Sequence, residues 1–137
     1  MLAREHEEMI VKGLVNYRLM QYIMILNYIR YVNNPQVALN YAKQMCSIYN
    51  SMVNWAMEYA RRMFGVELPY SEASKIVTAA LKRVSPVPYA ADVAEACAAY
   101  EQGNKDELTR RILEIMKSNF NAGGDFRRLR NSSAVLP

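Results

Sequence analysis

The few side chains of this sequence that could carry out chemistry do not have the spacing that such chemistry requires. The single histidine, His6, stands between Glu5 and Glu7, which is the nearest approach to a metal-ligand cluster. Adjacent residues on a helix point in different directions, so these groups do not converge on one ion. Acidic residues in the first turn of a helix complement its dipole, which explains the cluster better. We therefore expect no metal site.

The two cysteines, Cys46 and Cys97, are expected to lie within helices among apolar neighbours. A catalytic thiol needs an adjacent base and an electropositive setting, and neither cysteine has them nearby in the sequence. We therefore predict buried structural thiols rather than a nucleophile, a zinc-finger ligand set or a disulfide scaffold. The sequence also has no glycine-rich phosphate loop, carboxylate pair or Ser-His-Asp set. We expect no enzyme activity, no cofactor and no small-molecule substrate.

The most informative pattern is a long stretch without carboxylates, residues 9–57, which we call the acid-free stretch. It contains six tyrosines, seven asparagines and three glutamines, and no Asp or Glu. Its four cations are Lys12, Arg18, Arg30 and Lys43. From Glu58 onward the charges are dense and of mixed sign, as on an ordinary solvated surface. The formal net charge of +4 is modest, so where the charges lie matters more than their sum.

Two compatible interpretations of the acid-free stretch remain open. In the first, it is a buried helical hairpin whose amides and phenols form hydrogen bonds across an oligomer interface. In the second, it lies against nucleic acid, because phosphates repel carboxylates and accept hydrogen bonds from Asn, Gln, Ser and Tyr. Tyrosine rings can also pack on sugars or bases. Four cations give weak binding for each copy, so high affinity then requires many copies along one polymer.

The elements that must position these residues are predicted to be helical. The 137-residue chain is 52% hydrophobic and has five glycines and five prolines, which favours one compact domain over a turn-rich β fold. Residues 2–32 lack proline and predict one long helix. Asn34 and Pro35 suit the N-cap and first position of a second long helix. We expect this helix to reach about Phe64, where Gly65 ends it.

Three shorter helices are predicted after the second long one. Ser71 is expected to cap the first of them, and residues 89–101 to form the second. The third is expected over residues 105–120, with Asn104 and Glu107 as a capping pair at its start. No strand-like alternation is present. The predicted fold class is therefore all-α.

In more detail, we predict a long N-terminal helical hairpin over residues 1–64, a small helical bundle over 65–122 and a tail over 123–137. Helices of about 30 residues span roughly 45 Å, whereas a compact chain of this length is about 37 Å across. The hairpin is therefore expected to protrude beyond the bundle. Its first helix is apolar nearly all round from residue 14 to residue 32, so more than one face needs a partner. We expect self-association.

The start of the chain and its most apolar run bear on localisation. Residues 1–8 are polar and acidic, unlike a secretory signal. The run over residues 19–32 is interrupted by polar side chains and is shorter than the roughly 20 apolar residues that a membrane-spanning helix needs. We expect neither a secretory signal nor a transmembrane segment.

The order of these elements resembles a known family. Two long N-terminal helices around Asn33-Asn34-Pro35, poor in acids and rich in tyrosine, precede a small helical bundle of similar mass. This pattern, over the whole chain, resembles the major coat proteins of filamentous viruses of hyperthermophilic archaea. In that family the N-terminal helices of paired subunits wrap double-stranded DNA, held in A-form, and the C-terminal bundles form the outer wall.

The resemblance implies a structural coat protein that binds double-stranded DNA without sequence preference. It implies polymerisation with itself or with a sibling coat protein into a filamentous virion, assembled in the host cytoplasm. Carried over by position, the DNA-facing cations are Lys12, Arg18, Arg30, Lys43, Arg61 and Arg62. The DNA-facing polar residues carried over in the same way are Gln21, Asn40, Gln44, Ser47 and Asn54. In one departure from the family, the chain begins directly in an acidic helix, without a basic extended arm.

Two other classes of protein share these sequence features. The first is a small helical subunit of a CRISPR effector complex, which is also short, all-α, weakly basic and repeated along a nucleic acid. The second is a helical oligomer with no nucleic-acid role. The coat hypothesis predicts filaments, the effector-subunit hypothesis predicts discrete complexes of fixed length, and the oligomer hypothesis predicts no retention by DNA even at low salt.

Overall fold

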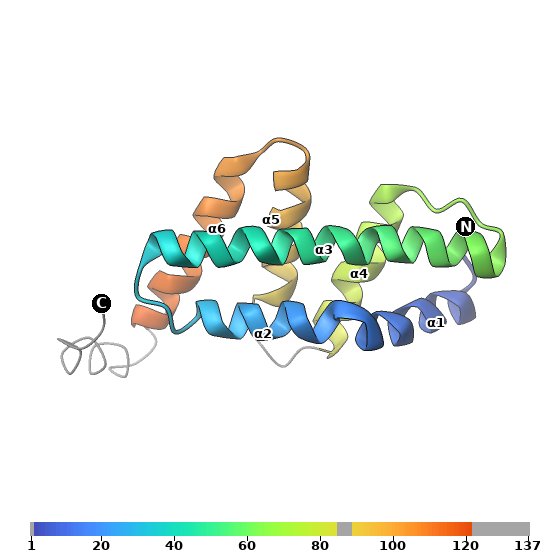
Figure 1. Ribbon diagram of the computed structural model, residues 1–137, viewed down its shortest axis with the longest axis horizontal. Helices are drawn as coiled ribbons and strands as arrows, with labels where there is room; N and C mark the ends of the chain where they lie inside the picture. Colours follow the sequence, from blue (N-terminus) through green and yellow to red (C-terminus); the bar gives the residue numbers. More distant parts are fainter. Residues whose placement is uncertain (1, 85–88, 122–137) are drawn as a thin grey trace.

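The computed structural model of the protein describes residues 2–84 and 89–121, and these residues form helices and no strand (Figure 1). The predicted all-α class is confirmed. The first long helix is α-helical over Arg4–Leu14 (α1), π-helical over Val15–Leu19 (η1) and α-helical again over Met20–Ile29 (α2). The remaining helices are α3 (Pro35–Phe64), α4 (Tyr70–Val84), α5 (Ala90–Glu101) and α6 (Lys105–Asn121). None of the helices within these described ranges is long and apolar enough to span a membrane.

The ends of α3 are those that its sequence predicts. The side-chain oxygen of Asn34 accepts hydrogen bonds from the backbone N–H groups of Gln36 (2.9 Å) and Val37 (3.3 Å). Pro35 occupies the first turn, where its missing N–H costs nothing. At the other end Gly65 adopts a left-handed conformation with φ of 65°, which glycine tolerates without steric strain. Asn34 therefore begins the second long helix of the hairpin, and Gly65 ends it.

The π-helical turn in the first helix was not predicted, although the apolar spacing contains a signal for it. Buried positions advance by four residues from Ile10 to Leu14, and then by five from Leu14 to Leu19. An α-helix cannot keep residues five apart on one face, whereas a π-helical turn does. The continuous helix predicted over residues 2–32 is therefore shorter, Arg4–Ile29, and contains this wider turn.

The shorter helices follow the prediction with one correction at α4. This helix begins at Tyr70, so Ser71 lies inside it and the prediction that Ser71 caps it is wrong. The carbonyl of Pro69 accepts instead from the N–H groups of Glu72 and Ala73, both at 3.0 Å. One half of the predicted capping pair of α6 is confirmed, because Asn104 Oδ1 accepts from the N–H of Glu107 at 3.3 Å. The reciprocal half is not formed, since the N–H of Asn104 donates to the Ala99 carbonyl at 2.9 Å.

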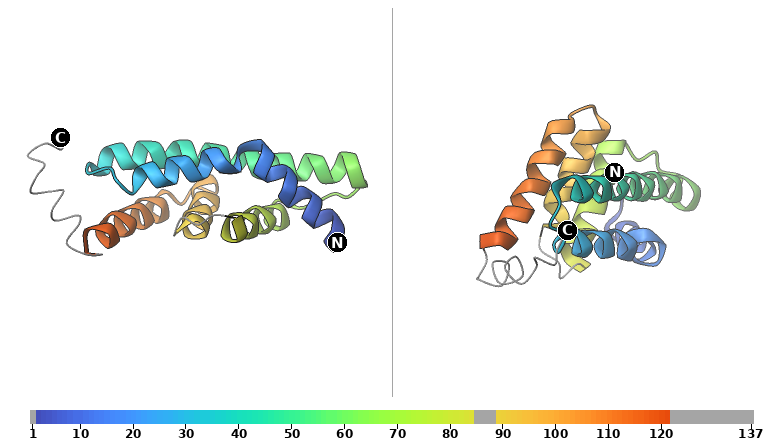
Figure 2. Two further views of the ribbon diagram at one scale, coloured as in Figure 1. Left: turned by 90° about the horizontal axis from the view of Figure 1, so that it is seen from below. Right: turned by 60° about the vertical axis from the view of Figure 1, so that its left-hand side comes forward.

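The helices form two layers. The first helix and α3 lie antiparallel in one layer, and α4, α5 and α6 cover one face of that hairpin (Figure 2). The three short helices lie along the hairpin rather than in a cluster at one end. The hairpin nevertheless extends beyond α4 at the end where α3 finishes (Figures 1 and 2). Apolar side chains from both layers meet between them, which gives each short helix its own contact with the hairpin. The largest fully buried side chains are Tyr22, Tyr49, Ile10, Leu14, Leu19, Leu26, Ile29, Met45, Met52, Leu81, Ile112 and Val53.

Two tyrosines of the acid-free stretch belong to this core. The Tyr22 hydroxyl donates to the Ala90 carbonyl at 3.0 Å, and burial raises the pKa of Tyr22 well above its usual value. The Tyr49 hydroxyl is hydrogen-bonded to the Ser74 hydroxyl of α4. Both phenols therefore join the hairpin to the second layer and are not available on its surface.

Cys46 and Cys97 form a disulfide, so the prediction of two free structural thiols is wrong. The bond joins α3 to α5 across 51 residues of sequence, with a Cα–Cα distance of 4.9 Å. Both cysteines are buried, as predicted. The pairing depends on α5 packing on α3, which no spacing within the sequence indicates.

Removing this disulfide by the double substitution Cys46→Ala and Cys97→Ala is expected to lower the free energy of unfolding by about 2–4 kcal/mol, because the unfolded chain regains the freedom of a long loop. Urea unfolding followed by circular dichroism measures the change. A reducing agent should lower the midpoint of the natural protein and leave that of the double variant unchanged. Equal midpoints for the oxidised and reduced natural protein would contradict the expectation.

Candidate nucleic-acid interface

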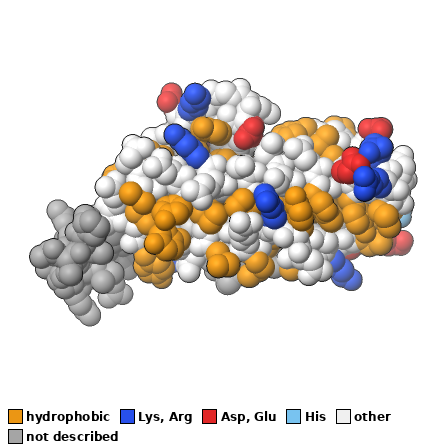
Figure 3. All heavy atoms as spheres, in the orientation of Figure 1, with side chains coloured by type: hydrophobic (Ala, Val, Ile, Leu, Met, Phe, Trp, Pro, Cys, Tyr) orange, Lys and Arg blue, Asp and Glu red, His pale blue; other side chains and the backbone are white. Residues whose placement is uncertain are grey.

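The face of the hairpin opposite α4, α5 and α6 is not covered by any described helix, and we call it the open face (Figure 2). Figure 3 shows bands of hydrophobic side chains along the hairpin, with charged side chains sparse over its middle. Exposed large apolar residues contribute Met9, Tyr17, Met20, Met24, Tyr28, Tyr31, Val37 and Met63 to the hairpin surface. Exposed apolar residues gathered on one face of a folded protein are typical of an interaction site.

A row of aromatic rings links the first helix to α3. The Trp55 ring stacks on Tyr17, with ring centroids 5.6 Å apart, and contacts Tyr59 at 4.9 Å. Phe64 continues the row, 5.7 Å from Tyr59, and His6 stacks on Phe64 at 3.8 Å. The imidazole of His6 is thus part of a ring stack. Offset and edge contacts between aromatic rings stabilise such a row beyond their buried area alone.

Gly13 is what allows the first helix to approach Trp55. A Cβ atom at this position would overlap the far end of the indole ring and lie only 3.0 Å from its Cζ2 atom. The Trp55 ring also packs against Tyr17 and Tyr59, so it has little room to move away from an added Cβ atom. Glycine is therefore required here by close packing rather than by its backbone conformation.

Gly13→Ala is expected to destabilise the protein by about 1–3 kcal/mol, as overpacking does, although alanine ordinarily favours helices over glycine. In a Trp55→Leu background the same substitution should cost much less, because the ring that it overlaps is gone. Urea unfolding of the four proteins in a double-mutant cycle gives the coupling. An equal cost of Gly13→Ala in both backgrounds would show that Trp55 is not the cause.

The four cations of the acid-free stretch differ in their surroundings. Lys12 and Lys43 are exposed, and neither forms an ion pair with a carboxylate among the described residues. Arg18, in the π-helical turn, reaches across to α3, where its Nη1 donates to the Ser51 hydroxyl at 3.3 Å. Its guanidinium also lies 5.8 Å from the centroid of the Tyr17 ring. Arg30 is half-buried, and its guanidinium lies 5.9 Å from the centroid of the Tyr31 ring.

The other two predicted cations, Arg61 and Arg62, lie near the end of α3 and are paired. Arg61 Nη2 lies 2.5 Å from Glu58, and Arg62 Nε lies 2.9 Å from the same carboxylate. The hydrogen bond from Arg61 is the largest cause that lowers the pKa of Glu58. All three side chains are largely exposed, so these pairs contribute little to stability. A phosphate at this end of the hairpin would have to compete with Glu58 for the two guanidinium groups.

The predicted polar residues all reach solvent. Gln21 is exposed on α2, and the other four are exposed on α3 at steps of three, four and seven residues, which keep them on one side of that helix. These four are Asn40, Gln44, Ser47 and Asn54. One of them, Asn40, accepts a hydrogen bond from the Gln36 side chain at 3.4 Å. Together with Lys43 they make this side of α3 polar and free of carboxylates from Pro35 to Met57.

Sequence interpretation missed a hollow at the turn of the hairpin. Met24, Tyr28 and Tyr31 are 59–69% exposed and line a cavity of about 630 Å³, together with residues from the start of α3. The spacing of these three residues, four and then three apart, was a detectable signal for a common face. The signal was hidden because apolar residues occupy nearly every face of the predicted helix from residue 14 to residue 32.

The charges of the second layer follow a different pattern. In α6, Glu107 and Glu114 pair with Arg110 at 2.5 and 2.6 Å, and Glu107 also pairs with Arg111 at 3.0 Å. A pair between Arg83 of α4 and Glu8 of α1, at 2.7 Å, joins the two layers at one end. Mixed, mutually paired charges are typical of a solvated surface, in contrast to the acid-free hairpin.

Comparison with protein-family models, with curated proteins and with solved structures finds no match to this chain. The fold and this surface together define a class of protein: a two-layer helical protein with an acid-free, aromatic hairpin surface. The function has to be inferred from that surface.

Proposed function

We propose that the protein is a major coat protein that polymerises around double-stranded DNA, held in A-form, to build a filamentous virion. The observation that carries the proposal is the separation of charge between the layers. The hairpin has no carboxylate from residue 9 to residue 57, whereas the described part of the second layer is rich in paired acids and bases. Carboxylates on a surface that meets phosphates would repel them, and the few cations of the hairpin would give each copy only weak binding.

The groups on the hairpin suit contacts with the sugar-phosphate backbone. Lys43 is exposed and forms no ion pair among the described residues, and Lys12 is exposed but lies one turn from Glu8, with which it interacts. The exposed amides of α3 can donate to phosphate oxygens. Contacts with the backbone do not depend on the base sequence, as the packaging of a whole genome requires. A regular backbone geometry is read by shape, as proteins read A-form duplexes. Each copy then contributes a few weak contacts, and the polymer adds them together.

The exposed apolar residues support the second half of the proposal, assembly with neighbours. Met9, Met20 and Met24 lie on the surface of the first helix, and methionine adapts its shape to varied partners. In the proposed filament these side chains pack against a second copy or a sibling coat protein. The virion, assembled in the host cytoplasm, would be the site of action.

The alternative of a small subunit of a CRISPR effector complex shares the acid-free surface but requires RNA and larger partner proteins. A helical oligomer with no nucleic-acid role accounts for the apolar residues alone. The exposed Lys43 among the amides of α3 favours the coat hypothesis over this last alternative, since an interface between proteins gains nothing from an unpaired charge.

Electron microscopy of the natively isolated protein, with and without nuclease, tests the proposal directly. We expect long uniform filaments that contain duplex DNA protected from the nuclease. Small discrete particles with bound RNA would support the effector-complex alternative, and particles free of nucleic acid would support the plain oligomer. Either outcome would overturn the coat hypothesis.

A charge variant tests the contacts in solution. Replacing Arg18, Arg30 and Lys43 together by glutamine should weaken binding to duplex DNA and reduce the slope of log affinity against log salt by about three, since each cation releases about 0.9 counterions. Fluorescence anisotropy across a salt series measures both quantities, and circular dichroism checks the helicity.

The matched control for that variant replaces three exposed lysines of the second layer, Lys75, Lys82 and Lys105, by glutamine. It removes the same net charge, but from the layer formed by α4, α5 and α6 rather than from the hairpin. We expect its salt slope to remain close to that of the natural protein. If the two triple variants bind duplex DNA equally, the hairpin is not the nucleic-acid interface.

A further inference from the structure

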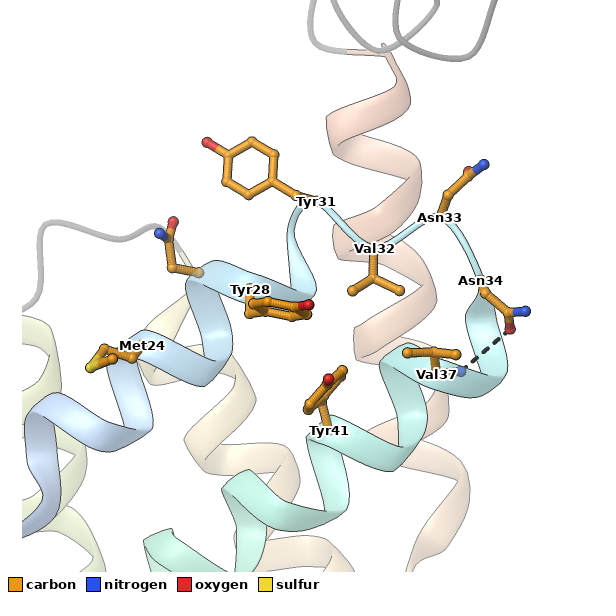
Figure 4. Close-up of a pocket in the computed structure, with 9 residues that line it drawn as sticks. Met24, Tyr28, Tyr31, Val32, Asn33, Asn34, Val37 and Tyr41 are labelled. Carbon is orange, nitrogen blue, oxygen red and sulfur yellow. Dashed lines mark hydrogen bonds between the residues drawn. The ribbon is translucent and has the colours of Figure 1, made fainter. Parts of the chain in front are cut away.

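The cavity at the turn of the hairpin has a lining that the proposed coat function does not use. It measures about 630 Å³, within the range of roughly 300–1,000 Å³ typical of small-molecule sites. Its residues come from the end of α2, the connecting turn and the first two turns of α3. Figure 4 shows Tyr28, Val32, Val37 and Tyr41 pointing toward a common space, whereas Tyr31 and Asn33 point away from it.

The shape of this space suits a flat ligand. The rings of Tyr28 and Tyr41 have centroids 5.0 Å apart and planes inclined by 58°. They therefore form two walls that meet at an angle, and a planar ring can lie against one face while its edge meets the other wall. Val32 and Val37 close the cavity beside them (Figure 4).

The charge of the lining restricts the ligand further. None of the residues that line the cavity carries a charge, so a phosphate or an ammonium group would lose its hydration there without compensation. The neighbouring Tyr28 raises the pKa of Tyr41, by charge repulsion first and then by a side-chain hydrogen bond, and Tyr41 is a neutral phenol. A phenol hydroxyl both donates and accepts hydrogen bonds, as does the amide of Asn27 among the lining residues.

From these features we infer that the cavity binds an uncharged, planar heterocycle with hydrogen-bonding groups on its edge, the chemistry of a nucleobase. The ring stacks on tyrosine, and the edge meets phenol and amide groups. The same chemistry is offered by a free nucleoside and by an unpaired base at the end of a strand. Binding of such a ring does not depend on the coat function proposed above.

Isothermal titration calorimetry with adenosine and cytidine, neither of which carries a charge, tests the site in the natural protein. We expect saturable binding that Tyr41→Leu weakens about tenfold or more, as loss of a base–aromatic stack does. The matched control is Tyr100→Leu, which removes a half-buried tyrosine of α5 outside both the cavity and the hairpin and should change the affinity by less than about twofold. Circular dichroism of both variants checks that they fold.

Val37→Asp provides a second variant, because Val37 is 39% exposed and its substitution leaves the core intact. A carboxylate there should also weaken nucleoside binding. To identify the source of the base, a blunt duplex is compared with one that carries a single unpaired adenine at its end. Tighter binding of the overhang duplex, lost in Tyr41→Leu, would assign the site to a strand end, and equal binding of the two duplexes together with adenosine binding would assign it to a free nucleoside.

The absence of saturable binding by both nucleosides and by the overhang, or equal affinities of Tyr41→Leu and Tyr100→Leu, overturns the inference. If Val37→Asp instead dissociates an oligomer that binds no nucleoside, the occupant is a second copy of the chain, and the inference is likewise overturned. Failure of the coat function appears separately, as loss of salt-dependent binding to the blunt duplex.

Discussion

The close approach of the first helix to α3 at Gly13 is the contact on which the hairpin surface depends. Without a side chain at this position, the indole of Trp55 fits against the first helix and begins the row of rings that ends at His6. The π-helical turn starts two residues later and returns Leu19 to the buried face. Both features act on one short segment, and together they decide which side chains the first helix buries and which it exposes.

The same segment determines where positive charge lies on the hairpin. In a regular α-helix, residue 18 would follow Ile10 and Leu14 toward the core, which a guanidinium cannot enter without great cost. The wider turn instead takes Leu19 inward and leaves Arg18 half-buried, in contact with Ser51 and Tyr17. An unusual helix geometry thus reconciles a charged residue with an otherwise apolar helix.

Much of the fold could be predicted because its boundaries are local. Asn34, Pro35, Gly65 and Asn104 mark helix ends through their own backbone and side-chain chemistry, and each lies where the sequence indicated. The disulfide and the arrangement of the three short helices could not be predicted, because they depend on contacts between residues far apart in sequence. The π-helical turn is intermediate between the predictable helix ends and the unpredictable long-range contacts. The five-residue step from Leu14 to Leu19 is visible in the sequence, but the segment was interpreted as a regular helix that is apolar on all sides.

The candidate site was predictable only to the level of composition. The absence of acids from residue 9 to residue 57 is a property of the sequence, but the separation of six tyrosines into core and surface is not. Tyr22 and Tyr49 are fully buried, whereas Tyr28 and Tyr31 are exposed, and helical phase decides between them. The pairing of Arg62 with Glu58, four residues earlier, could have been anticipated from spacing alone.

The disulfide between α3 and α5 has a mechanical consequence. It fastens the hairpin layer to the second layer at a buried point, where Tyr22 and Tyr49 already join the layers by hydrogen bonds. A force that shears one layer over the other is therefore resisted by a covalent bond. The two layers of one copy therefore move together as a single stiff body. In the filament proposed above, bending would take place at the joints between copies, and the copies themselves would keep their shape.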